Sequence, residues 1–304
     1  MIYFYFADGQ LCNQLFQYSF LKTYIKNKII VCSNFSELGK FIDLKKDRYL
    51  IYFNNQLIKF FLRRFIYYIL RFFSEIRFIH SIKVKTKILY GSVIEYNDLI
   101  LKDGLIPWTL VYPCYFQNDK FFSKKIVKDF KVYKQHEVNA KFFLDSIPKK
   151  FNPVFVHIRT SRIFNEYKKF KIFGYLGVHL PINYYKSCIQ WFLKNISNPY
   201  FIFISDDVPY IKNKFSYLEN KIFSTNSIFV DLMIISRCSY GVMSNSSVSW
   251  WGGYFNKKKI KIFAPKYWLG WKRKITLQHN GEPKYATLID PNIFKNKHKN
   301  NSIY

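Results

Sequence analysis

The sequence predicts an α/β fold in which parallel strands alternate with helices over two domains. Apolar runs that end in small or polar residues recur along the chain, and segments with helical spacing lie between several of them. The chain has 304 residues, more than a single hydrophobic core usually serves, and 49% of them are hydrophobic. This composition favours a folded protein with a large core over a disordered one.

The elements can be placed in order along the chain. The predicted strands are 2–7, 154–158, 200–204, 240–243 and 261–264. The predicted helices are 14–24, 57–79, 184–193 and 231–238. The stretch 141–153 is polar and rich in turn residues, so we place a domain boundary there, with domains at 1–150 and 151–290. A basic polar tail, 291–304, is expected to fray.

Charge and cysteine content limit the kinds of partner and compartment. Lysine and arginine number 48 against 19 acidic residues, a net charge of +29 that indicates an anionic partner such as a nucleic acid, an anionic lipid or a phosphorylated substrate. The odd number and scattered spacing of the cysteines predict reduced thiols and no zinc site: Cys12, Cys32, Cys114, Cys188 and Cys238. With neither a secretory signal nor an apolar run of about 18 residues, we expect a cytoplasmic protein without a membrane span.

One segment suggests contact with a membrane surface. From Leu57 to Ile79 the chain interleaves eight aromatic residues with five lysines and arginines, a pattern typical of a basic amphipathic helix lying in a bilayer interface. The alternative is a core helix whose basic face meets solvent.

The segment 239–253 reads as a buried strand, a hydroxyl-rich turn and a glycine pair. Backbone N–H groups and hydroxyls at Ser246 and Ser247 suit a phosphate, and a following helix would add its N-terminal dipole. The glycines are expected to let the backbone approach the ligand closely. The alternative is an ordinary strand, turn and helix with Trp250 and Trp251 in the core.

Polar residues near other predicted strands and helices are candidates too: the Gly9 turn, His157 and Arg159, Asp206 and Asp207, and Asp231. An arginine at a strand end can donate two hydrogen bonds to a diphosphate, or it can form a structural ion pair. The paired aspartates can hold magnesium or cap the next helix, and capping is the interpretation we favour. For Asp231 the plain role is a helix N-cap.

Several motifs occur in a fixed order along the chain: G-Q-L-C-N-Q-L-F-Q-Y from Gly9, Y-F-Q-N-D-K-F-F from Tyr115, H-I-R from His157, L-P-I-N-Y-Y from Leu180, S-D-D from Ser205, the segment from Asp231, N-S-S-V-S-W-W-G from Asn245 and A-P-K-Y-W from Ala264. Over about residues 2–270 they resemble glycosyltransferase family 11, the α-1,2-fucosyltransferases. The resemblance implies the GT-B architecture, with two Rossmann-like domains facing a central cleft. It also implies GDP-fucose as donor, inversion at the anomeric carbon, and no metal.

The resemblance also implies roles for individual residues. Arg159 would contact the β-phosphate, and Asn245, Ser246 and Ser247 would bind the nucleotide sugar at its phosphates. His157 and Asp231 would contact the guanosine, and Asn13 would line the cleft near the departing diphosphate.

The chain departs from the family pattern in two places. The residues Thr160-Ser161-Arg162 stand where the family has a second arginine, a glycine and an aspartate, and Cys12 replaces a glycine of the first turn. The acceptor hydroxyl must also lose its proton, for which Asp8, Glu166 and Asp206 are candidates and Glu166 is preferred.

These observations predict a cytoplasmic, inverting glycosyltransferase, peripheral on the inner face of the cytoplasmic membrane. It would move L-fucose from GDP-fucose to a hydroxyl of a cell-surface glycan intermediate, which a lipid can carry, and form an α-1,2 linkage. One alternative keeps the enzyme but uses another GDP-deoxysugar. The other is a non-catalytic, basic membrane- or RNA-binding protein, although we expect no nucleic-acid partner.

Overall fold

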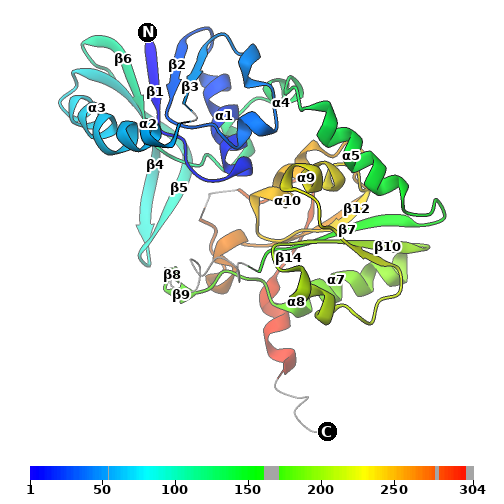
Figure 1. The fold of residues 1–304 in the computed structure, drawn as a ribbon. Coiled ribbons are helices and arrows are strands. Elements are labelled where there is room, and N and C mark those ends of the chain that lie inside the picture. Colours follow the sequence, from blue (N-terminus) through cyan, green and yellow to red (C-terminus); the bar gives the residue numbers. More distant parts are fainter. Residues whose placement is uncertain (54, 161–170, 278–280, 299–304) are drawn as a thin grey trace. The chain divides into compact units, whose positions relative to one another are not determined.

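The computed structural model describes residues 1–53, 55–160, 171–277 and 281–298, and strands alternate with helices through most of them (Figure 1). The strands are β1 Ile2–Tyr5, β2 Ile29–Cys32, β3 Leu50–Tyr52, β4 Ile79–Leu89, β5 Ser92–Lys102, β6 Ile106–Val111, β7 Asn152–Ile158, β8 Lys171–Ile172, β9 Tyr175–Leu176, β10 Pro199–Ser205, β11 Lys221–Phe223, β12 Tyr240–Val242, β13 Lys261–Pro265 and β14 Thr287–Ile289. The α-helices are α1 Leu11–Tyr24, α2 Gln56–Phe61, α3 Tyr67–Glu75, α4 Lys124–Lys128, α5 Lys134–Asp145, α7 Ile182–Asn195, α8 Val208–Lys214, α9 Ile228–Ile235 and α10 Ser247–Phe255.

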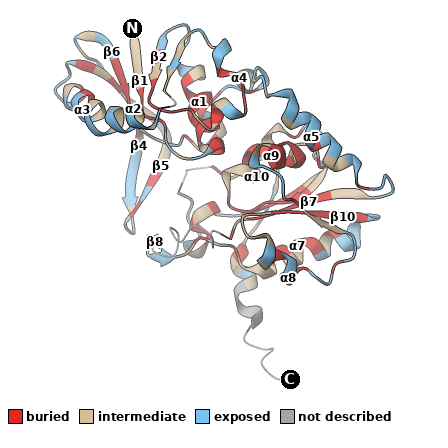
Figure 2. Cartoon of the chain, in the orientation of Figure 1, coloured by how far each residue is buried: buried red, intermediate tan, exposed pale blue. Residues whose placement is uncertain are grey.

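Burial follows from the apolar pattern of the strands. β7 and β10 are buried along most of their length, as expected for parallel strands that are covered on both faces (Figure 2). Helices α5, α9 and α10 lie over one face of their sheet, and α7 and α8 lie over the other (Figure 1). One core cluster joins the apolar faces of α7 and α8 to β7, β10, β12 and β13.

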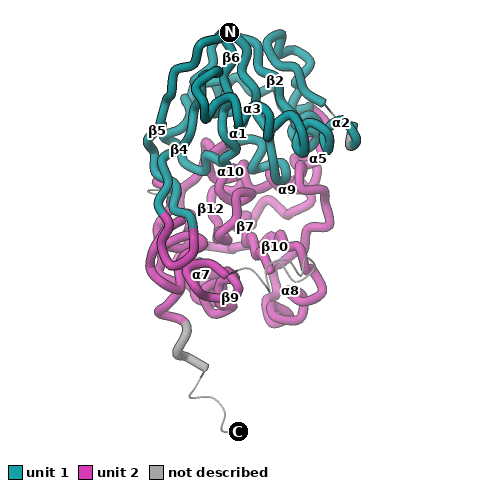
Figure 3. The backbone as a smooth tube through the Cα atoms, turned by 90° about the vertical axis from the view of Figure 1, so that its left-hand side faces the viewer, with its two compact units in different colours: residues 1–87, 93–133, 278–281 teal, residues 88–92, 134–277, 282–304 magenta. Residues whose placement is uncertain are grey.

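The chain forms two compact units (Figure 3). Among the described residues, unit 1 holds 1–87, 93–133 and 281, and unit 2 holds 88–92, 134–277 and 282–298. Helix α5 therefore belongs to unit 2, where it packs on α9 and His136 stacks on Phe229 with ring centroids 5.1 Å apart.

The unit 2 sheet has the strand order β11-β10-β7-β12-β13-β14, and every neighbouring pair is parallel. Counted within this sheet, the order is third, second, first, fourth, fifth, sixth, which is the order of the nucleotide-binding Rossmann sheet. The unit 1 sheet has the order β3-β2-β1-β6-β4-β5. Its first strand, β1, lies in the middle of the sheet, as β7 does in the unit 2 sheet. Two parallel-rich α/β sheets confirm the predicted fold class of two Rossmann-like domains, as in GT-B proteins.

The predicted helix 57–79 is shorter in the structure: α2, a π-helical stretch Leu62–Ile66 and α3 run from Gln56 to Glu75, and Ile79 already belongs to β4. One stripe of this helical segment, which includes Leu62, Ile66 and Leu70, packs on Phe6, just after β1, and on apolar residues of β1, β4 and β6. The rest of the segment is largely exposed (Figure 2). One face of the segment is therefore core, as the alternative interpretation expects, and the other face is open. Contact with a membrane surface stays a prediction. Within the described ranges, no helix has the length and apolar content that crossing a bilayer requires.

The start of the tail is ordered, so the expectation that the whole tail frays is wrong. Residues Pro291–His298 form a 3₁₀ helix, the Asn292 side-chain amide donates to the Trp271 carbonyl at 2.6 Å, and Phe294 packs against Tyr184. Apolar burial of Phe294 and this hydrogen bond hold the segment on unit 2.

Candidate functional site

Polar residues from neighbouring strands meet at the carboxyl edge of the unit 2 sheet. β7 and β12 are adjacent although they are the first and fourth strands of the sheet along the chain, so the strand order reverses between them. In open parallel sheets ligands bind at such a reversal. The register pairs Val156 with Val242, so Ile158 and Ser244, each two residues further on, leave the sheet side by side.

Ser244 lies at the centre of the hydrogen bonds at this edge. Its Oγ accepts from the backbone N–H of Arg159 at 3.3 Å and from the hydroxyl of Tyr185 at 3.1 Å, and it donates to Oδ1 of Asn245 at 3.3 Å. A hydroxyl has one hydrogen and two lone pairs, so these contacts use its full capacity. The adjacent Tyr184 donates to the backbone of the same loop. The L-P-I-N-Y-Y motif thus fixes the loop that follows β12.

Asp206 holds the segment that carries Arg159. Its Oδ1 accepts from the backbone N–H of Thr160 at 2.7 Å and from the Thr160 hydroxyl at 3.0 Å, and its Oδ2 lies 3.5 Å from Nη1 of Arg159. The capping prediction is confirmed for Asp207, whose carboxylate accepts from Tyr210 N–H at the start of α8. It is wrong for Asp206, because the register of β10 with β7 directs this carboxylate to the neighbouring strand end.

Two histidines flank Arg159. His157 is buried in β7, and its Nδ1 has no hydrogen-bond partner among the residues that the structure describes. Burial and the nearby Arg159 guanidinium lower the pKa of His157 to about 4, despite the opposing charge of Asp206, so the ring is neutral at pH 7. His179 is half-buried and hydrogen-bonds the backbone of Arg159, and burial lowers its pKa as well.

The hydroxyl-rich turn leads into α10, as phosphate binding at a helix N-terminus requires. Ser246 is the N-cap residue, with its Oγ accepting from the Val248 N–H at 3.4 Å, and Ser247 is the first helical residue. Both serines are partly exposed. Asn245 is buried, and its amide donates to the Val178 carbonyl at 2.6 Å. Its side chain therefore supports the neighbouring loop as well as the turn.

The glycine pair serves close packing against α9 and Tyr285, so the prediction that it lets the backbone approach a ligand is wrong. A Cβ at Gly252 would lie 2.3 Å from Cγ2 of Ile235 in α9, and a Cβ at Gly253 would lie 2.5 Å from the ring of Tyr285. The two tryptophans before the pair are buried in the core, as the alternative interpretation expects.

Asp231 lies in the first turn of α9 and is 8% exposed. Its plain role as an N-cap is wrong, because Ser227 occupies that position. The carboxylate instead accepts a hydrogen bond from the Ser224 hydroxyl at 2.5 Å, just beyond β11. Burial raises the pKa of Asp231 to about 7, although this hydrogen bond acts in the opposite direction. α9 and α10 pack together, and both begin at the carboxyl edge of the sheet.

Unit 1 brings two sequence motifs together at the carboxyl edge of its own sheet. Asn13, in the first turn of α1, accepts a hydrogen bond on Oδ1 from Nε2 of Gln117 at 2.8 Å. Gln117 follows β6, and β6 is the neighbour of β1 where the strand order reverses. Gly9, which precedes α1, has a φ of +78° that favours glycine. Asn13 is thus fixed at the reversal point of unit 1.

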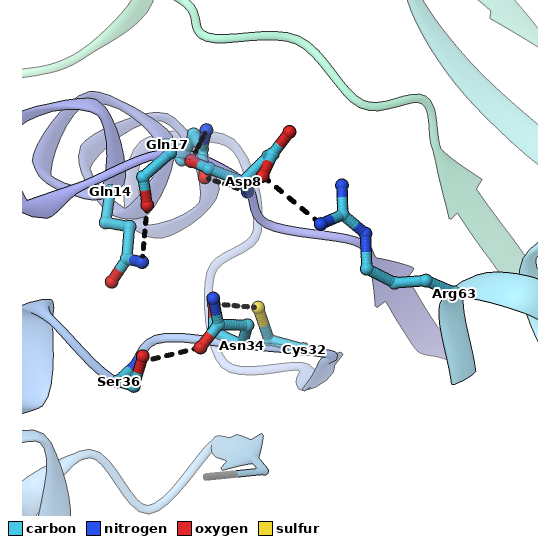
Figure 4. A network of polar contacts seen from close by, with 8 residues as sticks. Asp8, Gln14, Gln17, Cys32, Asn34, Ser36 and Arg63 are labelled. Carbon is cyan, nitrogen blue, oxygen red and sulfur yellow. Dashed lines mark hydrogen bonds and ion pairs between the residues drawn. The ribbon is translucent and has the colours of Figure 1, made fainter. Parts of the chain in front are cut away.

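Glutamine side chains of the first motif hold the turn after β1 (Figure 4). Gln17 bonds both the N–H and the carbonyl of Asp8, at 3.2 and 2.9 Å, and Gln14 donates to the Gly9 carbonyl at 2.9 Å. The Asp8 carboxylate lies 3.2 Å from Nη1 of Arg63. Burial alone would raise the pKa of Asp8, but the hydrogen bonds from Arg63 and the Gly9 N–H outweigh it and lower the pKa. A lowered pKa makes Asp8 a weaker base.

Two further expectations concern single residues. Cys12 is buried inside α1, so its side chain belongs to the helix and the core of unit 1. Glu166, the preferred base, and Arg162 lie outside the described residues.

Sequence reasoning missed Ser244, Tyr185 and His179 as parts of this network. Tyr185 lies within a quoted motif and Ser244 within the hydroxyl-rich turn, but the contact between them depends on how α7 packs against the loop after β12. His179 stands immediately before the Leu180-Pro181 pair, which was the one available signal.

The unit 2 site can bind an anion and stabilise charge that develops on it. Arg159 is 30% exposed and is held by Asp206, and the N-terminal end of α10 offers backbone N–H groups beside it. Over the described ranges, no three His, Cys, Asp or Glu side chains are grouped so that they can share a metal ion.

Comparisons with known proteins identify relatives. The family model described as Glycosyl transferase family 11 matches residues 94–280, more than half of the chain. The chain is 24% identical over 205 residues to the O-antigen biosynthesis glycosyltransferase WbnK of Escherichia coli, covering 66% of this chain and 62% of that protein. It is 28% identical over 178 residues to an Alpha-1,2-colitosyltransferase of Escherichia coli, covering 55% of this chain and 58% of that protein. The chain thus spans less than two thirds of the length of either relative.

Solved structures share the fold. The NodZ alpha-1,6-fucosyltransferase co-crystallized with GDP has a TM-score of 0.50 at 9% identity, covering 83% of this chain and 91% of that chain. The Se-Met fucosyltransferase NodZ from Bradyrhizobium has a TM-score of 0.50 at 9% identity, covering 86% of this chain and 93% of that chain. At these identities the likeness shows the fold alone.

Proposed function

Because this chain belongs to glycosyl transferase family 11, we propose that it moves L-fucose from GDP-fucose to a hydroxyl of a cell-surface glycan intermediate, with inversion and without a metal. The α-1,2 linkage is part of the proposal, and an Alpha-1,2-colitosyltransferase among the relatives supports it. The same relative is named for another sugar, so a different GDP-deoxysugar is the second candidate donor.

The observation that carries the proposal is the link between Arg159, whose backbone N–H donates to Ser244, and the turn that leads into α10, where the unit 2 strand order reverses. In the reaction the acceptor oxygen bonds to the anomeric carbon as the bond to the β-phosphate oxygen breaks. Negative charge then grows on the departing diphosphate, and cations or fixed donors aimed at its oxygens lower the barrier. Arg159, Ser246 and Ser247 are the residues that we assign to this task.

We assign guanosine recognition to His157 and Asp231. Guanine presents adjacent donors at N1 and its 2-amino group, and a carboxylate can accept both. The neutral, buried His157 ring keeps Nδ1 available as an acceptor or donor. Asn13 in unit 1 is assigned to the diphosphate. Glu166 remains our proposed base, since Asp206 is bonded to Thr160 and Arg63 lowers the basicity of Asp8.

We also propose that residues 57–79 attach the protein peripherally to the cytoplasmic face of a membrane. The support is an exposed apolar surface with cations interleaved, which includes Leu57 at 80%, Phe60 at 64% and Phe72 at 61% exposure. Such a position would bring the enzyme to a glycan acceptor that a lipid carries.

The test is donor hydrolysis and transfer with GDP-fucose, other GDP-deoxysugars, UDP-sugars and ADP-sugars, each with and without EDTA. We expect GDP-fucose to be used, EDTA to leave the rate unchanged, and Arg159→Ala to lower turnover about a hundredfold, as loss of a preorganised donor does. Arg237→Ala is the matched control, because the Arg237 guanidinium bonds Met233 and Ser236 at the C-terminal end of α9. Wild-type turnover in a folded Arg159→Ala variant, or use of UDP-sugars alone, would contradict the assignment.

A further inference from the structure

We propose that a pocket in unit 1 binds the diphosphate headgroup of a membrane lipid. The pocket has a volume of about 390 Å³ and is lined by Lys59, Phe60, Arg63, Arg64 and Tyr68. The proposal concerns a second anion site, distinct from the nucleotide-sugar site of unit 2, and it does not depend on which sugar the enzyme transfers.

The pocket lies on one helical surface. Lys59 and Arg63 are four residues apart, as are Phe60, Arg64 and Tyr68 in turn, and side chains at that spacing share a helix face. The helix is π-helical from Leu62 to Ile66, across the middle of the pocket. The opposite stripe is anchored in the core of unit 1 through Leu62 and Ile66, so the pocket is held on a fixed support.

The charge of the pocket matches a ligand with two negative charges. Its lining contains three cations and no carboxylate. Arg63 already pairs with Asp8, whereas Lys59 and Arg64 form no ion pair among the described residues. Lys59 also lowers the pKa of Asp8 through its charge, so the three cations share one carboxylate. The two positive charges that this leaves suit a diphosphate better than a single phosphodiester.

Apolar side chains around the pocket indicate that the anion belongs to a lipid. Phe61 and Phe65 are each 52% exposed, Tyr68 is 54% and Ile69 is 50% exposed. These side chains can enter the acyl boundary of a bilayer while the cations stay at headgroup level. A nucleic-acid surface needs stacking platforms and cations but gains nothing from exposed aliphatic residues such as Ile69.

The experiment compares binding to two sets of phosphatidylcholine vesicles with matched surface potential, one containing a prenyl diphosphate and the other phosphatidylglycerol. We expect the wild type to prefer the diphosphate vesicles about tenfold, because hydrogen bonds from Lys59 and Arg64 to a bound diphosphate remain when matched potential cancels the general attraction. The double variant Lys59→Gln, Arg64→Gln should lose that preference to within about twofold. The matched control, Arg71→Gln with Arg77→Gln, should bind both vesicles more weakly and keep the preference.

Each other outcome overturns the proposal. Equal wild-type binding at matched potential, or an unchanged preference in the pocket variant, would leave only general electrostatic attraction. Release from vesicles by equimolar inorganic diphosphate would make the free ion the ligand, and tighter binding to single-stranded RNA than to vesicles would make this a nucleic-acid surface. Thermal unfolding of each variant confirms that it is folded, and hydrolysis of GDP-fucose in solution should be unchanged in the pocket variant.

Discussion

Asp231 holds a carboxyl group whose protonation changes near neutral pH. The pKa of about 7 arises because burial in the first turn of α9 disfavours the charged form more than the Ser224 hydrogen bond favours it. Only the ionised carboxylate can accept from both guanine donors with both of its oxygens. Base selection by this residue should therefore depend on pH.

We predict that the ratio of GDP affinity to ADP affinity rises from pH 6 to pH 8. A bidentate base contact corresponds to roughly 1–3 kcal/mol of discrimination. The two nucleotides share the diphosphate, so its own titration cancels in the ratio. Calorimetric titration measures both affinities, and Asp231→Ala should lower the ratio and remove its pH dependence. A wild type that binds GDP, ADP and UDP equally would exclude a guanine site.

The same pKa has a consequence for stability with a definite sign. The pKa of Asp231 is higher in the folded protein than its value near 4 in the unfolded chain. The stabilisation of the fold that this difference provides is complete below pH 4 and is lost as the pH rises through 7. Asp231→Asn should remove that part of the pH dependence, which denaturant unfolding at several pH values would reveal.

Individual site residues could be predicted from sequence only where one local motif holds them. Arg159 could be predicted because it stands at the end of a strand, and Ser246 because it stands in a hydroxyl-rich turn. The role of Asp206 could not be predicted, because it depends on the register that pairs Ser205 with Ile158 across two strands far apart in sequence. The contact of Tyr185 with Ser244 likewise requires knowledge of helix packing.

At the scale of elements, the contact of α10 with α9 sets where the helix N-terminus lies. Gly252 has no side chain, and Ile235 occupies the space that a Cβ would need. Ile235 is fully buried and branched at Cβ, so it has little freedom to move away.

We predict that Gly252→Ala destabilises unit 2 by about 1–3 kcal/mol through overpacking, reduced by up to about 1 kcal/mol because alanine favours a helix. GDP should also bind more weakly, because α10 must shift. The double variant Gly252→Ala, Ile235→Ala should lose less free energy of unfolding than the two single variants lose together. Denaturant unfolding of the wild type, the two single variants and the double variant would measure this double-mutant cycle. Gly39→Ala is the control, since its nearest neighbour would lie 3.5 Å from the new Cβ. If the losses of unfolding free energy in the two single variants were additive, overpacking against Ile235 would not be the cause of the destabilisation.

The elements that the sequence predicted are those with continuous apolar runs. β7, β10, β12 and β13 were found to within two residues because both of their faces are buried. β4 and β5 were missed because they have many polar and charged residues, and β11 and β14 have three residues each. Short edge strands gain their order from pairing with neighbours, which a local pattern does not record.

For the whole molecule, the net charge of +29 and the open face of residues 57–79 favour the same anionic surface. Because exposed charges are screened by salt, the electrostatic part of that attraction weakens as ionic strength rises. Because salt weakens the charge attraction, we expect attachment of the protein to a membrane to require the apolar side chains of residues 57–79 as well as their cations.

We predict that replacing Arg63, Arg64 and Arg71 with glutamate releases the protein from membranes. Each removed cation costs about 1 kcal/mol at an anionic surface, and each added acid is repelled. Sedimentation with anionic vesicles measures the bound fraction, and glutamate at Lys45, Lys46 and Lys128 is the control for charge alone. Sedimentation of the first variant at the wild-type level would rule out attachment through this segment.

The five cysteines offer a practical route to site-specific labelling. Four are buried, Cys114 is partly exposed, and burial raises the pKa of all five thiols. Maleimides react with thiolates, so the native side chains should react slowly at neutral pH. A single cysteine placed at exposed Ile69 would then carry a fluorophore or spin label in an otherwise unmodified background, and its signal would report how deeply this helix enters a lipid headgroup layer.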